Sequence, residues 1–446
     1  MRPNNSVLFY GWIIALVSAF SLAVGGASRF SFGLFYVSIL DEFSWSHAAT
    51  AVAATAGALI YGFTAPAIGA VTDAFGPRII LPIGAVALGL GCLLASQVGS
   101  NTQLYVAYGI ISLGTGAFSF APQVAVISHW FQARRATASG VMFAGYGLGT
   151  LILVPLIQVL ISTYSWRTAF VIFGLFSMIT LIPLTAVLMR HRPQEMGLEP
   201  DGEGGHLLEG SERRKWLGLL TDNPGPILVV NQKWAACNWT LRHAAGTGRF
   251  WLVALGNGCV GITIYILTVH QAAHMVSVGY NALFAASIIG VWGLVRAGGS
   301  LFGGVMSDHW GREQSYTLSV SLSILGILIL LAVSDPTRLW MLYLYAILLG
   351  LGTGISTPTG GALVADIFQG SSIATILGAL EMFLGLGGAI GSWLGGYIFD
   401  VSTSYQLGFI IAIASLGVSC LAFWGAAPRR IRMVGQAARV RAPLER

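Results

Sequence analysis

The sequence predicts an all-α integral membrane protein with about twelve transmembrane helices in two six-helix halves. Of its 446 residues, 55% are hydrophobic and only 9% are charged, whereas a soluble globular protein carries roughly 25% charged residues. The apolar residues gather in runs of about 20, the length that an α-helix needs to cross roughly 30 Å of hydrocarbon. These runs are too long for the strands of a membrane barrel, so each is expected to be a helix.

About twelve such runs follow one another along the chain. The first has no small-residue cleavage site behind a short apolar core, so we expect it to be retained as a span and not removed as a signal peptide. The runs lie near residues 9–36, 48–71, 79–96, 104–131, 137–162, 167–189, 250–276, 282–306, 315–334, 338–363, 373–398 and 406–427.

A charged segment separates the first six runs from the last six. It begins at Arg190 with RHRPQEMGLEPDGEGG and later contains SERRK, and this mixture of charged and turn-forming residues is typical of a linker. Within it, the stretch PILVV and the residues from Trp239 to Ala245 are candidates for short interfacial helices. We therefore divide the chain into an N-terminal half, a cytoplasmic linker, a C-terminal half and a basic cytoplasmic tail, at residues 1–189, 190–248, 249–428 and 429–446.

Arginines collect on one side of the predicted spans. Short cytoplasmic loops carry an excess of positive charge, so this distribution predicts the orientation. The opposite loops hold Arg167 and Arg338 as exceptions. We expect a multi-pass protein of the plasma (inner) membrane with both termini in the cytoplasm. The arginines assigned to the cytoplasmic side are Arg78, Arg134, Arg135, Arg190, Arg192, Arg312, Arg429, Arg430, Arg432, Arg439 and Arg441.

The two halves repeat each other, as is common in transporter folds. The segment Gly69–Arg78 after the second run matches Gly304–Arg312 after the eighth, with an offset of 235 residues between Asp73 and Asp308. Two further matches share an offset of 238 residues, namely Leu113–Gly116 with Leu351–Gly354 and Gly147–Gly149 with Gly385–Gly387.

The repeated loop resembles a signature of the major facilitator superfamily. The sequence GVMSDHWGR, from Gly304 to Arg312, matches the signature GxxxDxxGR closely, and Gly69–Arg78 matches it loosely. The resemblance covers nearly the whole chain. It implies the major facilitator fold, in which spans one, four, seven and ten line a central cavity.

Further segments are similar to the branch of that superfamily that contains the monocarboxylate transporters and the oxalate/formate antiporters. This resemblance implies that the chain carries small organic anions and that an arginine in span eight, here Arg296, binds the carboxylate. The segments are Tyr10–Trp12, Arg29–Phe35, Trp130–Arg135 and, as in bacterial members, Tyr397–Asp400.

Three charged residues lie clearly inside predicted spans: Arg29, Arg296 and Glu381. A charge at the bilayer centre costs roughly 2.5 to 3.5 kcal/mol, so it usually faces the interior of the bundle and marks a transport pathway. Each has small residues three or four positions away, as expected of a surface that faces other helices. We assign the substrate carboxylate to Arg296, because its planar guanidinium matches a carboxylate. The alternative is a structural ion pair between Arg296 and Glu381.

Arg29 and Glu381 have two interpretations each. Arg29 resembles the span-one lysine of the monocarboxylate transporters, or else it extends to water from the outer end of its span. Glu381 is the candidate for proton coupling, because an apolar wall favours the neutral form of a carboxyl group. Trp292 stands where animal monocarboxylate transporters have an aspartate, so Glu381 replaces that acid or coupling is absent. The three charges sum to +1, which favours a monocarboxylate.

The remaining candidates carry weaker signals. His270 and His274 are one helical turn apart, but a metal site needs a third ligand, so we expect no metal or cofactor. His270 is either a cavity-mouth residue that hydrogen-bonds substrate or relays protons, or a histidine whose hydrogen bonds are satisfied at the membrane interface. Asp73, Arg78, Asp308 and Arg312 are expected at a cytoplasmic gate, or simply to end helices. The candidate cavity wall consists of Phe118, Gln123, Tyr146, Asn257, Tyr265, Ser356 and Thr359.

These patterns favour a secondary transporter over other classes. The leading hypothesis is a proton-coupled monocarboxylate symporter that works by alternating access; the alternatives are an anion exchanger of the oxalate/formate type and an exporter of drugs or metabolites. An intramembrane enzyme is disfavoured, because no Ser/His/Asp set, HExxH motif or acidic pair occurs in the spans. A nucleic-acid partner is disfavoured because only two of the basic residues are lysines and no basic stripe forms.

Overall fold

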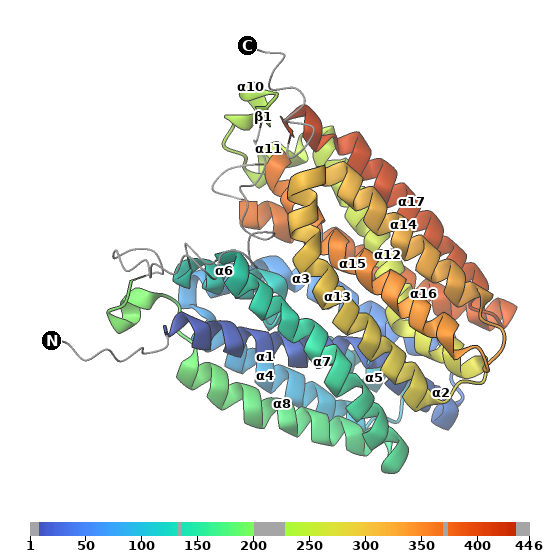
Figure 1. The fold of residues 1–446 in the computed structure, drawn as a ribbon. Coiled ribbons are helices and arrows are strands. Elements are labelled where there is room, and N and C mark those ends of the chain that lie inside the picture. Colours follow the sequence, from blue (N-terminus) through green and yellow to red (C-terminus); the bar gives the residue numbers. More distant parts are fainter. Residues whose placement is uncertain (1–8, 132–134, 200–227, 369–372, 434–446) are drawn as a thin grey trace, which may run out of the picture.

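The computed structural model describes residues 9–131, 135–199, 228–368 and 373–433. Within these residues twelve helical segments are long and apolar enough to cross a membrane, six before the linker and six after it. This confirms the predicted fold class. The fold is a bundle of two helical halves that converge at one end and diverge toward the other (Figure 1).

The first half contains eight helices that build six spans. Two spans are interrupted: α1 and α2 meet at Ser31, and α5 is separated from α6 by Phe118 and Ser119. The first span reaches Phe43, seven residues beyond the end at Tyr36 that hydropathy predicted, and it ends where Ser44 adopts a left-handed backbone. The bounds are α1 Gly11–Phe30, α2 Phe32–Phe43, α3 His47–Phe75, α4 Pro77–Ser96, α5 Asn101–Ala117, α6 Phe120–Trp130, α7 Arg135–Thr163 and α8 Trp166–Leu188.

The linker contains short elements, and those after residue 227 contact the second half. Part of the PILVV stretch forms strand β1 (Leu228–Val229), which pairs antiparallel with β2 (Arg432–Met433), so the helix expected there is wrong. The Trp234 indole donates a hydrogen bond of 2.7 Å to the carbonyl oxygen of Ile367. The other linker elements are η1 Pro193–Met196, α10 Gln232–Ala235 and α11 Leu241–Ala245, the last within the second predicted interfacial helix.

The second half contributes one helix to each of its six spans. These helices are α12 Gly248–Ser277, α13 Ala282–Trp310, α14 Arg312–Ala332, α15 Leu339–Ile367, α16 Ile373–Ser402 and α17 Gln406–Ala426, followed by η2 Pro428–Arg430. Polar side chains begin two of them: the Thr247 hydroxyl accepts from the Phe250 amide, and the Asn281 side chain accepts from the Leu283 amide. Such caps satisfy amides that the first helical turn leaves free.

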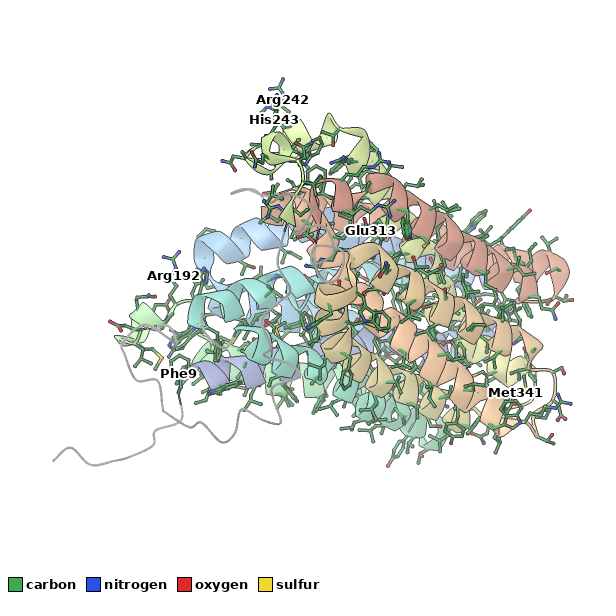
Figure 2. All side chains as sticks on the ribbon, turned by 45° about the horizontal axis from the view of Figure 1, so that its top comes forward. Phe9, Arg192, Arg242, His243, Glu313 and Met341 are labelled. Carbon is green, nitrogen blue, oxygen red and sulfur yellow. The ribbon has the colours of Figure 1, made fainter. Side chains whose placement is uncertain are left out.

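The two ends of the bundle differ in charge. We call the end that carries η1, α10, α11 and η2 the terminal face and the opposite end the far face (Figure 1). Figure 2 shows Arg192, Arg242 and His243 at the terminal face and Met341 at the far face. Arg134, Arg135 and the arginines after residue 433 lie outside the described side chains.

Equivalent helices of the two halves join them. Helix α3 of the first half packs along α16 of the second, and α7 packs along α13. The repeated glycines lie at both contacts. A Cβ added to Gly147 would lie 2.6 Å from the carbonyl oxygen of Gly293, and one added to Gly385 would lie 2.8 Å from that of Ala58. The sequence repeat therefore reflects close backbone approach at two equivalent positions between the halves.

Candidate functional site

The centre of the bundle holds an arginine from each half. Arg29 comes from α1, near the break before α2, and Arg296 comes from the middle of α13. Both lie where helices of the two halves meet, as the small residues around them predict. Their surroundings are mostly aromatic, and the two environments differ in whether a carboxylate is near.

Arg29 lies between two tyrosine rings. Its guanidinium carbon is 5.1 Å from the ring centroid of Tyr61 on α3 and 4.8 Å from that of Tyr265 on α12. The Arg29 Nε atom is buried and has no hydrogen-bond partner among the described residues. Cation–π attraction to the two rings is therefore the main direct contact of this charge.

Glu381 on α16 is the carboxylate near Arg29. The two charges interact electrostatically, and Glu381 also acts on the hydroxyl groups of Tyr61 and Tyr265. Glu381 nevertheless forms no ion pair or hydrogen bond with any described residue. The alternative ion pair between Arg296 and Glu381 is not among the ion pairs of the described residues, and Arg29 is the cation that acts electrostatically on Glu381.

Arg296 is enclosed by three aromatic rings and has no described acidic partner. Its guanidinium carbon lies 5.9, 5.1 and 5.5 Å from the ring centroids of Phe30, Tyr146 and Trp292. Phe30 packs edge-on against both other rings, at 5.6 Å from Tyr146 and 4.7 Å from Trp292. Two rings come from the first half and one from the second, so Arg296, like Arg29, is held by both halves. We call the space bounded by Arg29, Glu381, Arg296 and these rings the central chamber.

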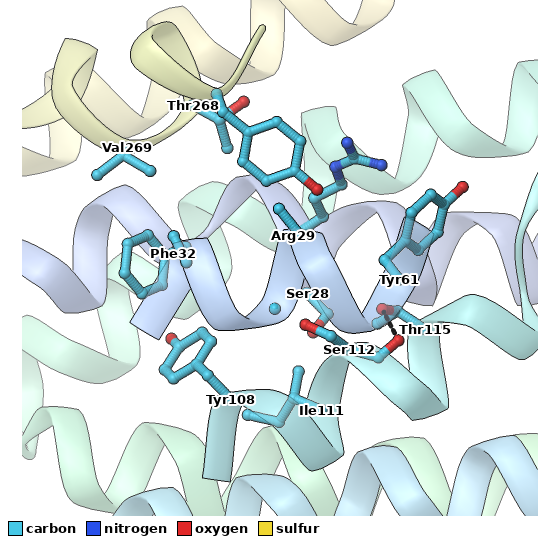
Figure 3. Close-up of a pocket in the computed structure, with 14 residues that line it drawn as sticks. Ser28, Arg29, Phe32, Tyr61, Tyr108, Ile111, Ser112, Thr115, Thr268 and Val269 are labelled. Atoms are coloured by element: carbon cyan, nitrogen blue, oxygen red, sulfur yellow. Dashed lines mark hydrogen bonds between the residues drawn. The ribbon is translucent and has the colours of Figure 1, made fainter. Parts of the chain in front are cut away.

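A cavity of about 50 Å³ adjoins Arg29 between α1, α3, α5 and α12. Figure 3 shows the Arg29 guanidinium beside the Tyr61 ring at one end of it, and Phe32 with Tyr108 at the other. The hydroxyl groups of Ser28, Ser112 and Thr115 also line this cavity. It therefore offers polar groups next to a cation whose Nε atom has no hydrogen-bond partner among the described residues.

The structure separates the predicted wall residues into two groups. Tyr146 and Tyr265 contact the chamber arginines, as described above. Four others are satisfied or packed elsewhere: the Asn257 amide donates to the carbonyl oxygen of Leu380 at 3.5 Å, the hydroxyl groups of Ser356 and Thr359 donate within their own helix, and Phe118 packs near Gly25. Gln123 is fully buried, and its side chain has no hydrogen-bond partner among the described residues.

His270 is fully buried near the far face and is not at an open cavity mouth. Its Nε2 atom lies 2.9 Å from the carbonyl oxygen of Ser392, and its ring is near those of Tyr36 and Tyr405. Burial raises the pKa of the Tyr405 phenol above its ordinary value, so this hydroxyl stays protonated. His274 faces a different carbonyl oxygen, that of Leu330, at 3.4 Å.

The far face has a contact between the halves that the sequence did not reveal. The carboxylate of Asp400, near the end of α16, accepts the backbone amides of His47 and Ala48 at 2.7 Å each, and the His47 ring nitrogen lies 3.2 Å from it. Asp400 thus caps the start of α3 in the other half. Farther in, the hydroxyl groups of Thr55 and Ser392 are 2.9 Å apart. The segment Tyr397–Asp400 indicated a family resemblance, but it did not predict that Asp400 caps α3.

The predicted gate residues that can be described contact their own half. Arg78 donates through Nε to the carbonyl oxygen of Ala186 at 2.7 Å. Arg312 donates to the carboxylate of Asp366 at 2.8 Å and to the hydroxyl of Ser307 at 3.0 Å. Asp366 was not among the predicted site residues, because an aspartate just after a predicted span is also explained by helix termination. The side chains of Asp73 and Asp308 lie outside the described residues.

Comparison with known proteins gives consistent matches over most of the chain. A model of the Major Facilitator Superfamily matches residues 18–337 and 250–444. Monocarboxylate transporter 13 of Rattus norvegicus is 26% identical over 408 residues, which cover 91% of this chain and 86% of that protein. Monocarboxylate transporter 11 of Homo sapiens is 25% identical over 414 residues, covering 90% of this chain and 80% of that protein.

Solved structures share the fold. One is a bacterial homolog of the human lysosomal transporter Spinster in an inward-facing and unoccupied conformation, with a TM-score of 0.67, 16% identity and coverage of 96% of this chain and 98% of that one. Another is the nucleoside transporter NupG, with a TM-score of 0.67, 14% identity and coverage of 94% and 100%. At these identities the likeness establishes the arrangement of the helices.

Proposed function

This chain belongs to the major facilitator superfamily of membrane transporters, and from that premise we propose that it is a proton-coupled symporter of small organic monocarboxylates. It is a transporter and not an enzyme. The relatives named monocarboxylate transporters support the substrate class. The two halves alternately open the central chamber to either side of the membrane, as transporters built from repeats do.

The observation that carries this proposal is the environment of Arg296. An arginine inside a membrane protein is costly, and this one has three π faces and no described acidic partner. Cation–π contacts leave the guanidinium fork free to bind a carboxylate through two parallel hydrogen bonds. Arg296 therefore binds the substrate carboxylate, and the rings of Phe30, Tyr146 and Trp292 hold the guanidinium in place.

The positions of Glu381 and Arg29 support proton coupling. Glu381 lies in a buried chamber within electrostatic reach of Arg29 but without a direct ion pair. When Glu381 takes up a proton, Arg29 loses its countercharge and attracts the incoming anion. The bound anion in turn favours the protonated acid, because the linkage between the two sites is reciprocal.

The terminal face is cytoplasmic in this proposal. It carries the described arginines Arg78, Arg190, Arg192 and Arg312, whereas the far face carries Arg167 and Arg338, and the positive charge of short loops marks the cytoplasmic side. The capped contact at Asp400 then closes the outer side. Asp73, Arg78, Asp308 and Arg312 belong to the cytoplasmic gate.

The first test replaces the carboxylate-binding arginine. Arg296→Lys keeps the charge but removes the planar fork, so uptake of labelled acetate, lactate and pyruvate into proteoliposomes should fall at least tenfold. Arg338→Lys, on the exposed far face, is the matched control and should transport like wild type. Wild-type uptake by folded Arg296→Lys would remove Arg296 from the binding site.

The second test concerns the proton. Glu381→Gln mimics the protonated acid permanently, so it should retain exchange of one anion for another but lose accumulation driven by a pH gradient. Uptake is measured with and without an imposed gradient for both proteins. Accumulation by the glutamine variant at the wild-type level would show that Glu381 does not carry the coupled proton.

A further inference from the structure

We propose that Tyr61 and Tyr265 are positioning residues that hold Arg29 away from Glu381, so that Glu381 remains free to exchange its proton. We call these two rings the tyrosine clamp. The inference rests on the proposed proton-coupled transport and assigns a role to two side chains that contact neither the proton nor the substrate carboxylate in that mechanism.

The clamp is defined by the contacts of Arg29. The guanidinium carbon is 5.1 Å from the Tyr61 ring centroid and 4.8 Å from the Tyr265 ring centroid. Its Nε atom is buried without a hydrogen bond to the described residues. The two π faces therefore hold the guanidinium in position, and it makes none of the hydrogen bonds or ion pairs to described residues that a buried arginine usually makes.

Both rings also come close to the helix that carries Glu381: Gly62, next to Tyr61, packs against Met382, and the Tyr265 ring packs against Gly388. The titratable and charged groups that face Glu381 are Arg29 from α1, Tyr61 from α3 and Tyr265 from α12. Glu381 is thus near one cation, yet it makes no ion pair with it among the described contacts. Without the rings, the flexible arginine side chain would be free to reach the carboxylate and form a charge-assisted pair.

A direct pair would impair coupling. An ion pair stabilises the ionised carboxylate, so a higher proton concentration would be needed to neutralise Glu381. The arginine would also be tied up when the anion arrives. With the clamp in place, Arg29 and Glu381 interact electrostatically over a longer distance than in a direct ion pair. This interaction is strong enough to link proton binding to anion binding and weak enough for Glu381 to release its proton.

The two rings of the clamp belong to different halves of the molecule, which move relative to each other during transport. Tyr61 belongs to the first half and Tyr265 to the second, and the Tyr265 ring packs tightly on α16, where a Cβ added to Gly388 would be within 2.4 Å of it. When the halves rock, the two rings separate. The hold on Arg29 is therefore tied to the conformation of the transporter.

The test compares removal of the ring with removal of the hydroxyl group. Tyr61→Leu and Tyr265→Leu remove a π face, so the pH at which gradient-driven uptake is half-maximal should fall by about one unit, given the usual strength of a desolvated cation–π contact. Tyr61→Phe and Tyr265→Phe keep the π face and should retain the wild-type profile. The measurement is uptake of labelled lactate into proteoliposomes between pH 5.5 and 8.5.

Repeating the leucine substitutions in Glu381→Gln protein tests whether their effect acts through the Glu381 carboxylate. In Glu381→Gln protein the leucine changes have no carboxylate to act on, so anion exchange should have the same pH profile with tyrosine or leucine at position 61. This comparison also controls for folding, because exchange must still occur. If Tyr61→Leu does not fold, the Tyr265→Leu pair of variants gives the same comparison.

Several outcomes would overturn the inference. An unshifted profile in both leucine variants would show that the rings do not control Glu381. An equal shift in the phenylalanine variants would assign the effect to the hydroxyl groups. If wild type transports no monocarboxylate or ignores the gradient, the proposed function fails instead, whereas a failure confined to the leucine variants leaves that function intact.

Discussion

The far face and the terminal face differ in which helices their polar contacts join. At the far face, Asp400 of the second half caps α3 of the first half, and Thr55 meets Ser392 across the same helix pair. At the terminal face, the described hydrogen bonds of Arg78 and Arg312 remain within one half. Among the described contacts, hydrogen bonds therefore tie the halves together at the far face, whereas those of Arg78 and Arg312 each stabilise one half.

This difference indicates where the molecule is built to open. A contact between the halves must break for the chamber to reach that side, whereas a contact within a half moves as part of a rigid body. The described structure is held closed at the far face, and its helices diverge toward the terminal face (Figure 1). We expect changes at the two faces to have different consequences, and the following predictions test this.

The largest effect is expected from Asp400→Ala. Loss of a capping carboxylate costs about 1 to 2 kcal/mol, and because this cap joins the halves, the ratio of closed to open far face should fall about five- to thirtyfold. Spin labels at Tyr164→Cys and Trp340→Cys, exposed on opposite halves, would report longer distances in double electron–electron resonance after replacement of the four native cysteines.

The matched control for this change is Asp335→Ala. Asp335 is also a far-face carboxylate that accepts a backbone amide, that of Thr337 at 2.9 Å, but it does so within the second half. The label distances should remain those of wild type. An equal lengthening in both variants would show that far-face charge, and not the contact between the halves, controls closure.

A smaller effect, on thermal stability and not on far-face closure, is expected from Asp366→Asn. This change removes the ionic partner of Arg312, whose side chain is 11% exposed against 13% for Asp366. The melting temperature should fall by a few degrees, corresponding to about 1 kcal/mol, while the far-face label distances stay unchanged. Longer far-face distances in this variant would contradict the assignment of this ion pair to a single rigid half.

The smallest effect is expected from Thr55→Val, which removes a neutral hydrogen bond between the halves. Such bonds contribute about 0.6 kcal/mol in membrane proteins, so the closed-to-open ratio should fall about threefold in the same distance measurement. Thr353→Val is the control, because the Thr353 hydroxyl bonds within its own helix. If both variants behave alike, the Thr55 contact does not help close the far face.

Much of the fold was predictable because it depends on local properties of the chain. Runs of about 20 apolar residues predicted all twelve spans, with the largest error at the charged end of the first one. Small residues around Arg29, Arg296 and Glu381 predicted that these charges face the interior. The glycines at Gly147 and Gly385 lie at equivalent helix contacts, as the repeat indicated.

The pairing within the site was not predictable in the same way. Helical periodicity tells which face of a helix turns inward, but not which residue of another helix it meets. Net charge alone allowed Glu381 to pair with either arginine, and the structure places it near Arg29. The sequence left open whether His270 lies at a cavity mouth or is a satisfied histidine, and the structure shows it buried against Tyr36 and Tyr405 with Nε2 2.9 Å from the Ser392 carbonyl oxygen.

The sequence by itself determined the membrane spans, their repetition in two halves and the three charges within the spans, because hydropathy, glycine spacing and charge are properties of short segments. Only the tertiary structure decided that aromatic rings from both halves surround each arginine and that Asp400 caps a helix that begins more than 350 residues earlier. The physical reason is that such contacts depend on the rotation, tilt and depth of helices packed against one another, which short-range patterns do not specify.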